Sequence, residues 1–319
     1  MNDPQGTNPP EHQWSDRNPE SSPKELITLV GMFLCLLVFL IWALNLVVGW
    51  LIVQMPVSWE RNLGQAIVKV YETQAKSGTE QAQLDLLVNK LEAIIPAESK
   101  AKRDYQVLYI PQDIVNAAAI PGDTILIFQG LLAQMESENE LMMVLGHELG
   151  HFAHRDHLRG IGRSLVIRTV VSSLFGDVTF LADAAQMVSN AKYSQSQEEE
   201  ADKYGLELLY QTYGQAVGAT DFFARMAEKQ SLNWDFLASH PAPAKRVKKL
   251  DELIKAKNYA IGTYTPLPEA LQTSVENKPS PWFCKRNLDL NWYFLLNIYP
   301  WFVILVTLTK RKPTPVSRL

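Results

Sequence analysis

Residues 141–158 read LMMVLGHELGHFAHRDHL, which is the strongest helical signal in the chain. Upstream of this stretch, Ser137 stands three residues before Glu140, a spacing that predicts a capping box at the start of a helix. We therefore expect one helix that begins after Ser137 and continues to the end of the stretch, at about residue 158. Residues four positions apart share one face of a helix, so His147 and His151 are expected to lie side by side, one turn apart.

The two histidines and the glutamate between them form an HExxH pattern. Imidazole nitrogens with this spacing can bind one zinc ion. Glu148 reaches the same side of the ion without binding it, which is the position of a general base that takes a proton from water. A catalytic zinc ion also needs a third protein ligand and an open position for water. The pattern predicts one Zn²⁺ per chain.

Two residues compete for the place of the third ligand. His157 has the spacing of the pattern HExxHxxGxxH, but that pattern requires glycine at position 154 to turn the chain, and His154 stands there. On a continuing helix His157 lies about 9 Å along the axis from His151, too far to join one tetrahedral site. Glu198 is the alternative, because on a later helix it shares a face with small and apolar residues and therefore points into the fold. We predict that Glu198 is the ligand.

HELGH and the downstream segment Glu198–Asp202 together resemble the membrane-associated gluzincin endopeptidases. This family includes the HtpX heat-shock protease, the CaaX prenyl endopeptidase and a mitochondrial inner-membrane stress protease. The resemblance extends from about Asn116 to Arg246 and includes the segment NAAAIPG and the pair His240-Pro241. The chain lacks the extra pair of spans that HtpX-like members insert between the two zinc motifs, so it looks more like the branch with a water-facing domain.

The resemblance implies a role for each matching residue. The implied zinc ligands are His147, His151 and Glu198, with Glu148 as the base. Asp202 is expected to orient a histidine ligand, as hydrogen bonding to ligating imidazoles also favours. His240 and Arg246 are expected near the metal as catalytic groups that stabilise an oxyanion or gate access, although His240 before a proline also fits a turn residue. One departure is that Arg155-Asp156-His157 replaces the family's usual Arg-His after the helix.

The segment NAAAIPG resembles the family's edge strand, beside which a substrate chain binds in an extended conformation. We predict that the substrate adds a strand next to Asn116, Ala117, Ala118 and Ala119. The small alanine side chains let one backbone approach another. Binding of this kind depends on the main chain more than on side chains, so we expect broad specificity.

Two apolar runs predict membrane spans. The first, Leu26–Val53, has no charged residue and is longer than the roughly 20 residues that a spanning helix needs. It also exceeds the roughly 7–15 apolar residues of a cleaved signal peptide. The second, Leu290–Thr309, contains aromatic residues and ends at three basic residues, which favours a second span. Its asparagines and Pro300 argue against a span, so a buried or interfacial hairpin helix remains the alternative. The basic cluster after this run predicts cytosolic tails and an extracytoplasmic domain.

The fold class predicted from these patterns is mainly α (α+β), a zincin-like helical domain with a small β-sheet between two transmembrane helices. Strands are expected at 105–110 and 124–129, and helices at 60–95, 161–190, 195–213, 215–230 and 243–257. The predicted segments are a disordered tail (1–23), a transmembrane helix (24–54), a zinc metallopeptidase domain (55–287), a second transmembrane helix (288–309) and a basic tail (310–319).

Composition excludes several other classes. Lys and Arg number 30 against 34 Asp and Glu, so there is no basic field for nucleic acid. The two cysteines form no CxxC pair, which argues against a disulfide framework and a cysteine metal site.

The sequence therefore predicts a membrane-anchored zinc metalloendopeptidase of the bacterial inner membrane. Its predicted partners are protein or peptide substrates and the lipid bilayer, and its predicted role is the quality control of misfolded or membrane proteins. Two alternatives remain, a catalytically silent chaperone-like or scaffold protein with a retained zinc site, and a binding module with a structural zinc. The intact base Glu148 argues against both.

Overall fold

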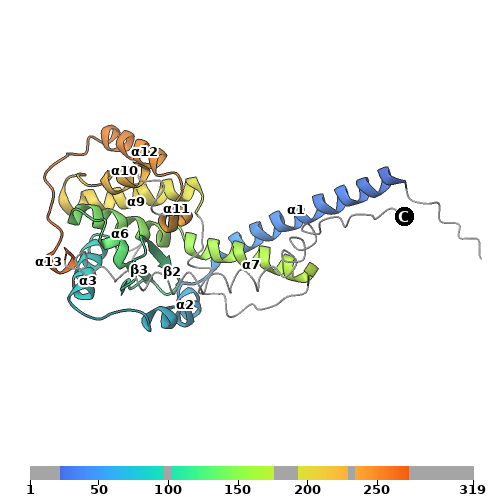
Figure 1. Cartoon of the computed structure of the whole chain (residues 1–319), viewed down its shortest axis with the longest axis horizontal. Coiled ribbons are helices and arrows are strands. Elements are labelled where there is room, and N and C mark those ends of the chain that lie inside the picture. Colours follow the sequence, from blue (N-terminus) through green and yellow to red (C-terminus); the bar gives the residue numbers. More distant parts are fainter. Residues whose placement is uncertain (1–21, 97–102, 176–192, 229–233, 273–319) are drawn as a thin grey trace, which may run out of the picture.

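The computed structural model describes residues 22–96, 103–175, 193–228 and 234–272 (Figure 1). The expected second span and basic tail, and all but the end of the expected disordered tail, lie outside these residues. The described elements are α1 (Pro23–Gln54), α2 (Val57–Glu72), α3 (Thr79–Glu92), β1 (Gln106–Ile110), β2 (Ala117–Ile120), β3 (Thr124–Phe128), α5 (Gln129–Leu132), α6 (Glu138–Ala153), α7 (Asp156–Phe175), α9 (Gln195–Tyr213), α10 (Asp221–Glu228), α11 (Trp234–Ser239), α12 (Pro243–Ala256) and α13 (Glu269–Gln272). The fold is mainly helical with one small sheet, as expected.

Helix α1 projects from the helical domain, and α7 packs along the part of α1 nearest to that domain (Figure 1). Ser22 and Glu25 form a capping box at its start, and the chain leaves it just before Pro56. Its apolar side chains are exposed along nearly its whole length. Within the described ranges it is the one helix long and apolar enough to cross a membrane.

The sheet has the strand order β1-β3-β2, with β1 parallel and β2 antiparallel to β3. The tight β2–β3 turn uses left-handed backbone at Gly122 (φ 98°) and Asp123 (φ 56°). Side chains alternate between the two faces of β2, so Ala117 and Ala119 join the main core, whereas Ile120 packs with α2. Helix α6 lies between this sheet and α9 (Figure 1), so the edge strand and the HELGH motif are neighbours.

The helices expected at 195–213, 215–230 and 243–257 correspond to α9, α10 and α12, whereas the helix expected to reach about residue 158 is broken. Helix α6 ends at Ala153 and α7 begins at Asp156. Between them Arg155 adopts left-handed backbone (φ 56°). The Arg155 guanidinium donates to the carbonyl oxygens of Ile52 (2.7 Å) and Met55, at the C-terminal end of α1. The prediction of one continuous helix was wrong because a contact with a distant segment stabilises the break.

The capping box expected at the start of α6 is only half formed. The Ser137 hydroxyl accepts a hydrogen bond from the backbone N–H of Glu140 (3.2 Å). The Glu140 carboxylate does not return this bond, because it accepts from the N–H of Glu136 (3.0 Å) and pairs with both Nη atoms of Arg225 (2.8 and 2.6 Å). A bidentate ion pair of this kind is stronger than one neutral hydrogen bond.

A buried ion network joins α2 to the start of α7. Glu60 is fully buried and accepts hydrogen bonds from Arg103 (both 2.9 Å), which also pairs with Asp123 in the β2–β3 turn. His157 Nε2 lies 2.8 Å from Glu60 Oε1. Burial alone would raise the pKa of Glu60, but the bonds from His157 and Arg103 outweigh it and lower that pKa to about 2. His157, whose spacing from His151 excluded it as the third ligand, belongs to this buried network.

Candidate metal centre

Small residues allow α6 and α9 to pack backbone against backbone. A Cβ atom on Gly150 would lie 2.8 Å from the Cα of Ala201, and one on Gly205 would lie 2.8 Å from the backbone nitrogen of His147. These distances are shorter than a Cβ contact tolerates, so larger residues would separate the helices. The close approach brings the Glu198 carboxylate, which starts α9, against the histidines of α6.

Four buried side chains converge at this point. His147, His151, Glu198 and His240 each offer one donor atom, and these atoms all lie within 4.8 Å of one another. The Nε2 atoms of His147 and His151 are 3.1 Å apart, and His240 Nδ1 is 3.1 Å from Glu198 Oε1. The structure thus brings together the three predicted ligands, and it adds His240 as a fourth group able to bind a metal.

The arrangement fits a divalent metal ion. Two imidazole nitrogens that face each other at 3.1 Å, beside a carboxylate oxygen, form the nitrogen and oxygen donor set that zinc sites use. His240 Nε2 is buried without a hydrogen-bond partner among the described residues. The His240 nitrogen that faces the cluster is Nδ1, which lies 3.3 Å from His147 Nε2, so Nε2 is the ring nitrogen left for another partner.

Two carboxylates hold the histidine rings from outside the cluster. Asp202 Oδ1 lies 2.9 Å from His147 Nδ1, and Asp156 Oδ2 lies 3.1 Å from His151 Nδ1. A carboxylate on Nδ1 keeps the proton there and leaves the Nε2 lone pair for a metal. Asp202 was expected in this position. The sequence alone does not single out Asp156, because on a continuing helix it would point away from His151, and only the break after α6 turns it back.

We expect Asp156→Asn to weaken metal affinity by about 10–100-fold, because the neutral amide holds the His151 ring and its tautomer less firmly. Competition with a chromophoric chelator measures the affinity. Glu200→Gln is the matched control, since this exposed acid on α9 pairs only with Lys203 among the described residues. An unchanged affinity in Asp156→Asn would show that the carboxylate does not position the ligand.

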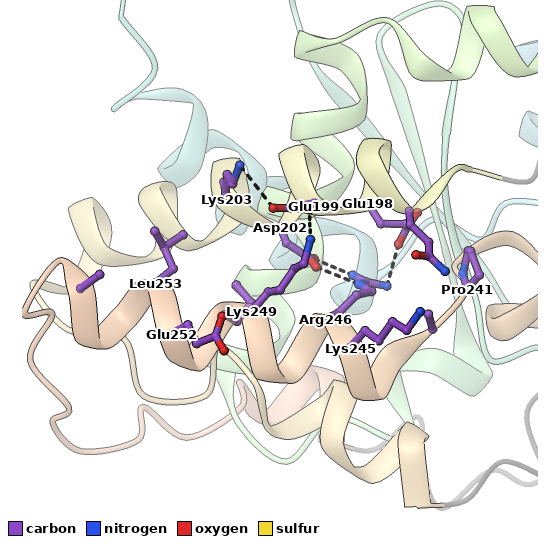
Figure 2. A pocket seen from close by; sticks show the side chains of 14 residues that line it. Glu198, Glu199, Asp202, Lys203, Pro241, Lys245, Arg246, Lys249, Glu252 and Leu253 are labelled. Carbon is purple, nitrogen blue, oxygen red and sulfur yellow. Dashed lines mark hydrogen bonds and ion pairs between the residues drawn. The ribbon is translucent and has the colours of Figure 1, made fainter.

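Arg246 pairs with two acids, Glu198 of the cluster and Asp202 beside it. Its guanidinium, buried at the start of α12, donates to Asp202 through Nε (2.8 Å) and Nη2 (2.6 Å), and its Nη1 lies 2.7 Å from Glu198 Oε2. Figure 2 shows the side chain reaching from α12 toward α9 between these two acids. Burial would raise the pKa of Glu198, but Arg246 and His240 hold it well below its usual value, so the carboxylate is ionised.

The surroundings shift the pKa values of the two histidines of α6 in opposite directions. Burial lowers the pKa of His147, and the neighbouring Arg246 lowers it further, which favours the neutral ring that a metal binds. Burial also acts to lower the pKa of His151, but hydrogen bonds to Asp156 and Glu198 outweigh it and raise this pKa to about 9. The raised pKa means that a metal ion binding to His151 competes with a proton.

Glu148 is fully buried beside the cluster. Neither of its carboxylate oxygens has a hydrogen-bond partner among the described residues, and Oε1 lies 3.7 Å from His240 Nε2. A buried carboxylate without a partner is unusual, because burial of the charge is costly. The arrangement leaves both oxygens available to a water molecule or a substrate.

Aromatic rings stack on two of the histidines, and the residue before the edge strand bonds to the residue before His240. Tyr193 stacks on His151, with ring centroids 3.8 Å apart, and Phe236 stacks on His240 at 4.7 Å. No local motif in the sequence marks either ring. Asn116 Oδ1 accepts hydrogen bonds from the N–H of Ala117 (3.0 Å) and the hydroxyl of Ser239 (3.3 Å). The predicted substrate strand is therefore tied to the residue before His240.

A cavity of about 340 Å³ lies between α9 and α12 (Figure 2). Glu198, Asp202 and Arg246 line this cavity together with other charged side chains, such as Lys249, and with apolar ones, such as Leu250. The cavity thus reaches the ion pairs that support the metal ligands.

An HExxH helix, a carboxylate from a later helix beside its two histidines, and carboxylates on both histidine Nδ1 atoms form the arrangement of a metallopeptidase site. Residues 79–254 match the family model described as Peptidase family M48, which is more than half of the chain. The chain belongs to peptidase family M48.

Similar proteins include two from Escherichia coli (strain K12) and one plant protein. The chain is 32% identical over 165 residues to Metalloprotease LoiP, which covers 48% of this chain and 63% of that protein. It is 31% identical over 160 residues to Metalloprotease YcaL, with 47% and 62% covered. It is 32% identical over 149 residues to Mitochondrial metalloendopeptidase OMA1 of Arabidopsis thaliana, with 46% and 31% covered. The chain thus spans less than two thirds of the length of each of these relatives.

Proposed function

We propose that this protein is a zinc-dependent metalloendopeptidase, anchored in a membrane by α1, that hydrolyses peptide bonds of misfolded or membrane-associated proteins. The observation that carries the proposal is the Glu148 carboxylate, buried beside four convergent metal-binding groups with both oxygens free of hydrogen bonds from described residues. Membership of family M48, and relatives whose names describe metalloproteases and metalloendopeptidases, support it.

His147, His151 and Glu198 would hold the ion. A zinc ion held there would polarise the scissile carbonyl and lower the pKa of a water molecule. Glu148 takes a proton from the attacking water at its carboxylate and passes it to the leaving amine. The Nε2 atom of His240 lies 3.7 Å from Glu148 Oε1 without a hydrogen bond from described residues, and a ring nitrogen there can donate to the developing oxyanion.

For Arg246 we propose a positioning role in place of the catalytic role expected from the sequence. Its guanidinium is occupied by Asp202 and Glu198 and is buried. Through Asp202 it fixes the ring of His147, and through Glu198 it balances a ligand charge. A group held in this way on two carboxylates has little freedom to reach a substrate.

The substrate chain would bind extended along β2. This strand is at one edge of the three-stranded sheet, and its central residues are Ala118 and Ala119, whose side chains leave room for a second backbone. The tie between Asn116 and Ser239 places the strand next to His240. Main-chain pairing gives broad specificity, which suits misfolded proteins as substrates.

We propose a bacterial inner-membrane location with the catalytic domain on the extracytoplasmic side. The apolar α1 supports the membrane part of this proposal, and the two Escherichia coli relatives support only a bacterial source. The basic residues that follow 290–309 in the sequence favour a cytosolic C-terminus, provided that this run forms the second span.

Chelation tests the function. The purified full-length protein is expected to cleave casein, to lose this activity in 1,10-phenanthroline, and to regain it when zinc is added back, because Glu148 has no water to act on without the metal. Release of acid-soluble peptides measures the cleavage. A zinc-loaded, folded protein that cleaves neither casein nor unfolded membrane proteins would contradict the proposal.

A second candidate is a metal site without catalysis. One observation favours it, namely that His240 supplies a fourth possible ligand, and structural zinc sites are closed by four protein ligands. The same assay separates the two, because a structural metal predicts loss of the fold on chelation without any proteolysis before it.

A further inference from the structure

Helix α2 has two apolar faces, and the residues that the structure describes cover only one of them. Ile67, Val68 and Tyr71 pack against the sheet. On another side of the helix, Trp59, Leu63, Ala66 and Val70 are exposed, with exposed fractions of 67% for Trp59, 50% for Leu63 and 44% for Val70. We call these four residues the α2 stripe. At about 100° per residue they fall within an arc of about 60°, so they form one continuous line along the helix.

We infer that the α2 stripe lies in the membrane interface and seats the peptidase domain on the bilayer surface. The inference rests on the part of the proposed function that anchors the chain through α1. The occupant of the stripe is then the boundary between lipid headgroups and acyl chains, which accepts a helix lying in the plane of the membrane.

The link between α1 and α2 carries the inference. Helix α1 ends at Gln54 and α2 begins at Val57, so only two residues separate them. The uncharged run Leu26–Val53 at 1.5 Å per residue measures about 42 Å, which equals the thickness of a bilayer with its headgroups. The first turn of α2 therefore starts at headgroup level, and Trp59, an aromatic residue typical of that level, is exposed there.

The charges around the α2 stripe agree with this placement. From Leu26 to Trp59 the chain has no charged residue. The next residue, Glu60, is charged but is buried in its ion network. Helix α7 starts at the same end of α1, where a Cβ atom on Gly162 would lie 2.6 Å from Val48. Its Arg159 and Arg163 are exposed one turn apart and can contact phosphate groups of lipids.

Contact of the α2 stripe with the membrane would bring β2, the proposed substrate strand, close to the bilayer. The covered face of α2 packs on Ile120 of β2, and a Cβ atom on Gly64 would lie 2.2 Å from the backbone of Pro121, so the helix rests directly on the β2–β3 turn. Figure 1 shows α2 at the end of the domain from which α1 projects. A membrane protein with an unfolded segment could thus reach β2 without leaving the bilayer.

Depth-dependent fluorescence quenching tests the inference. Both native cysteines, Cys35 and Cys284, are replaced by serine, and single cysteines are introduced by Leu63→Cys, Ala66→Cys or Gln65→Cys. Each is labelled with an NBD fluorophore in the full-length protein in phosphatidylcholine nanodiscs with or without acyl-chain-brominated lipid. Gln65 is the matched control, because it is exposed on the same helix about 130° from the stripe. A protein that retains only native Cys35 reports on α1.

We expect brominated lipid to quench the labels at 63 and 66 at least about threefold more than the label at 65, because the stripe reaches the acyl boundary. Equal weak quenching at 63 and 65, with Cys35 quenched, would overturn the inference while leaving the anchor and the peptidase intact. An unquenched label at Cys35 would overturn both the membrane insertion of α1 and the membrane contact of the α2 stripe. If position 63 forms cross-linked dimers and its label is not quenched, the stripe contacts a second copy of the chain, and the proposed contact with lipid is overturned. Chelator-sensitive casein cleavage by each variant reports separately on the peptidase.

Discussion

Glu148→Gln is expected to lower proteolysis by about 10²–10⁴-fold while the protein stays folded and keeps its metal. The amide has the size of the carboxylate but cannot take a proton from water. Glu148 accepts no hydrogen bond from any described residue, so its replacement breaks no described hydrogen bond. The loss should therefore appear in kcat and leave the free energy of unfolding almost unchanged.

Three measurements separate this outcome from simple damage to the site. A fluorogenic peptide assay gives kcat and KM, elemental analysis gives zinc per chain, and thermal unfolding gives Tm. Glu200→Gln makes the same chemical change on an exposed side chain of α9 and should behave like the wild type. Full activity of Glu148→Gln with bound zinc would exclude Glu148 as the base.

Arg246→Met should have the largest effect on stability, a loss of about 3–5 kcal/mol, because it leaves buried acids without their partner. Asp202 and Glu198 both depend on this guanidinium, and burial otherwise raises the pKa of each. The zinc content should fall as well, since Asp202 no longer holds the His147 ring in a fixed orientation.

The neighbouring Lys245→Met is the control, because this exposed side chain lines the same cavity without joining the cluster. Arg246→Lys restores one positive charge but not the planar fork, so it should recover part of the stability and less of the metal affinity. Denaturant unfolding and zinc stoichiometry measure the two effects. An Arg246→Met protein with unchanged stability and full zinc would contradict the positioning role.

Local patterns were sufficient where the information lies within one helix. The HELGH spacing places two imidazoles on one face of α6, and the small and apolar residues after Glu198 predict that this carboxylate points inward. Helix α9 has the bounds expected from its pattern, 195–213. These predictions depend on the helical repeat alone, which every residue of a helix obeys.

Contacts between distant segments decided what the pattern could not. The break at Arg155 depends on the carbonyl groups at the end of α1, roughly 100 residues earlier in the chain. The same break turns Asp156 toward His151 and sends His157 to Glu60. A sequence read as one continuous helix places both side chains elsewhere.

The sequence by itself determined the HExxH helix, the apolar anchor and the carboxylate that faces the histidines, because each follows from composition or a periodic repeat. Only the tertiary structure decided which groups surround them. His240 joins the cluster of candidate ligands and Arg246 pairs with two acids because the chain folds back so that α12 packs against α9. Buried charges are stable only when partners meet them in space, and those partners come from segments that no local repeat connects.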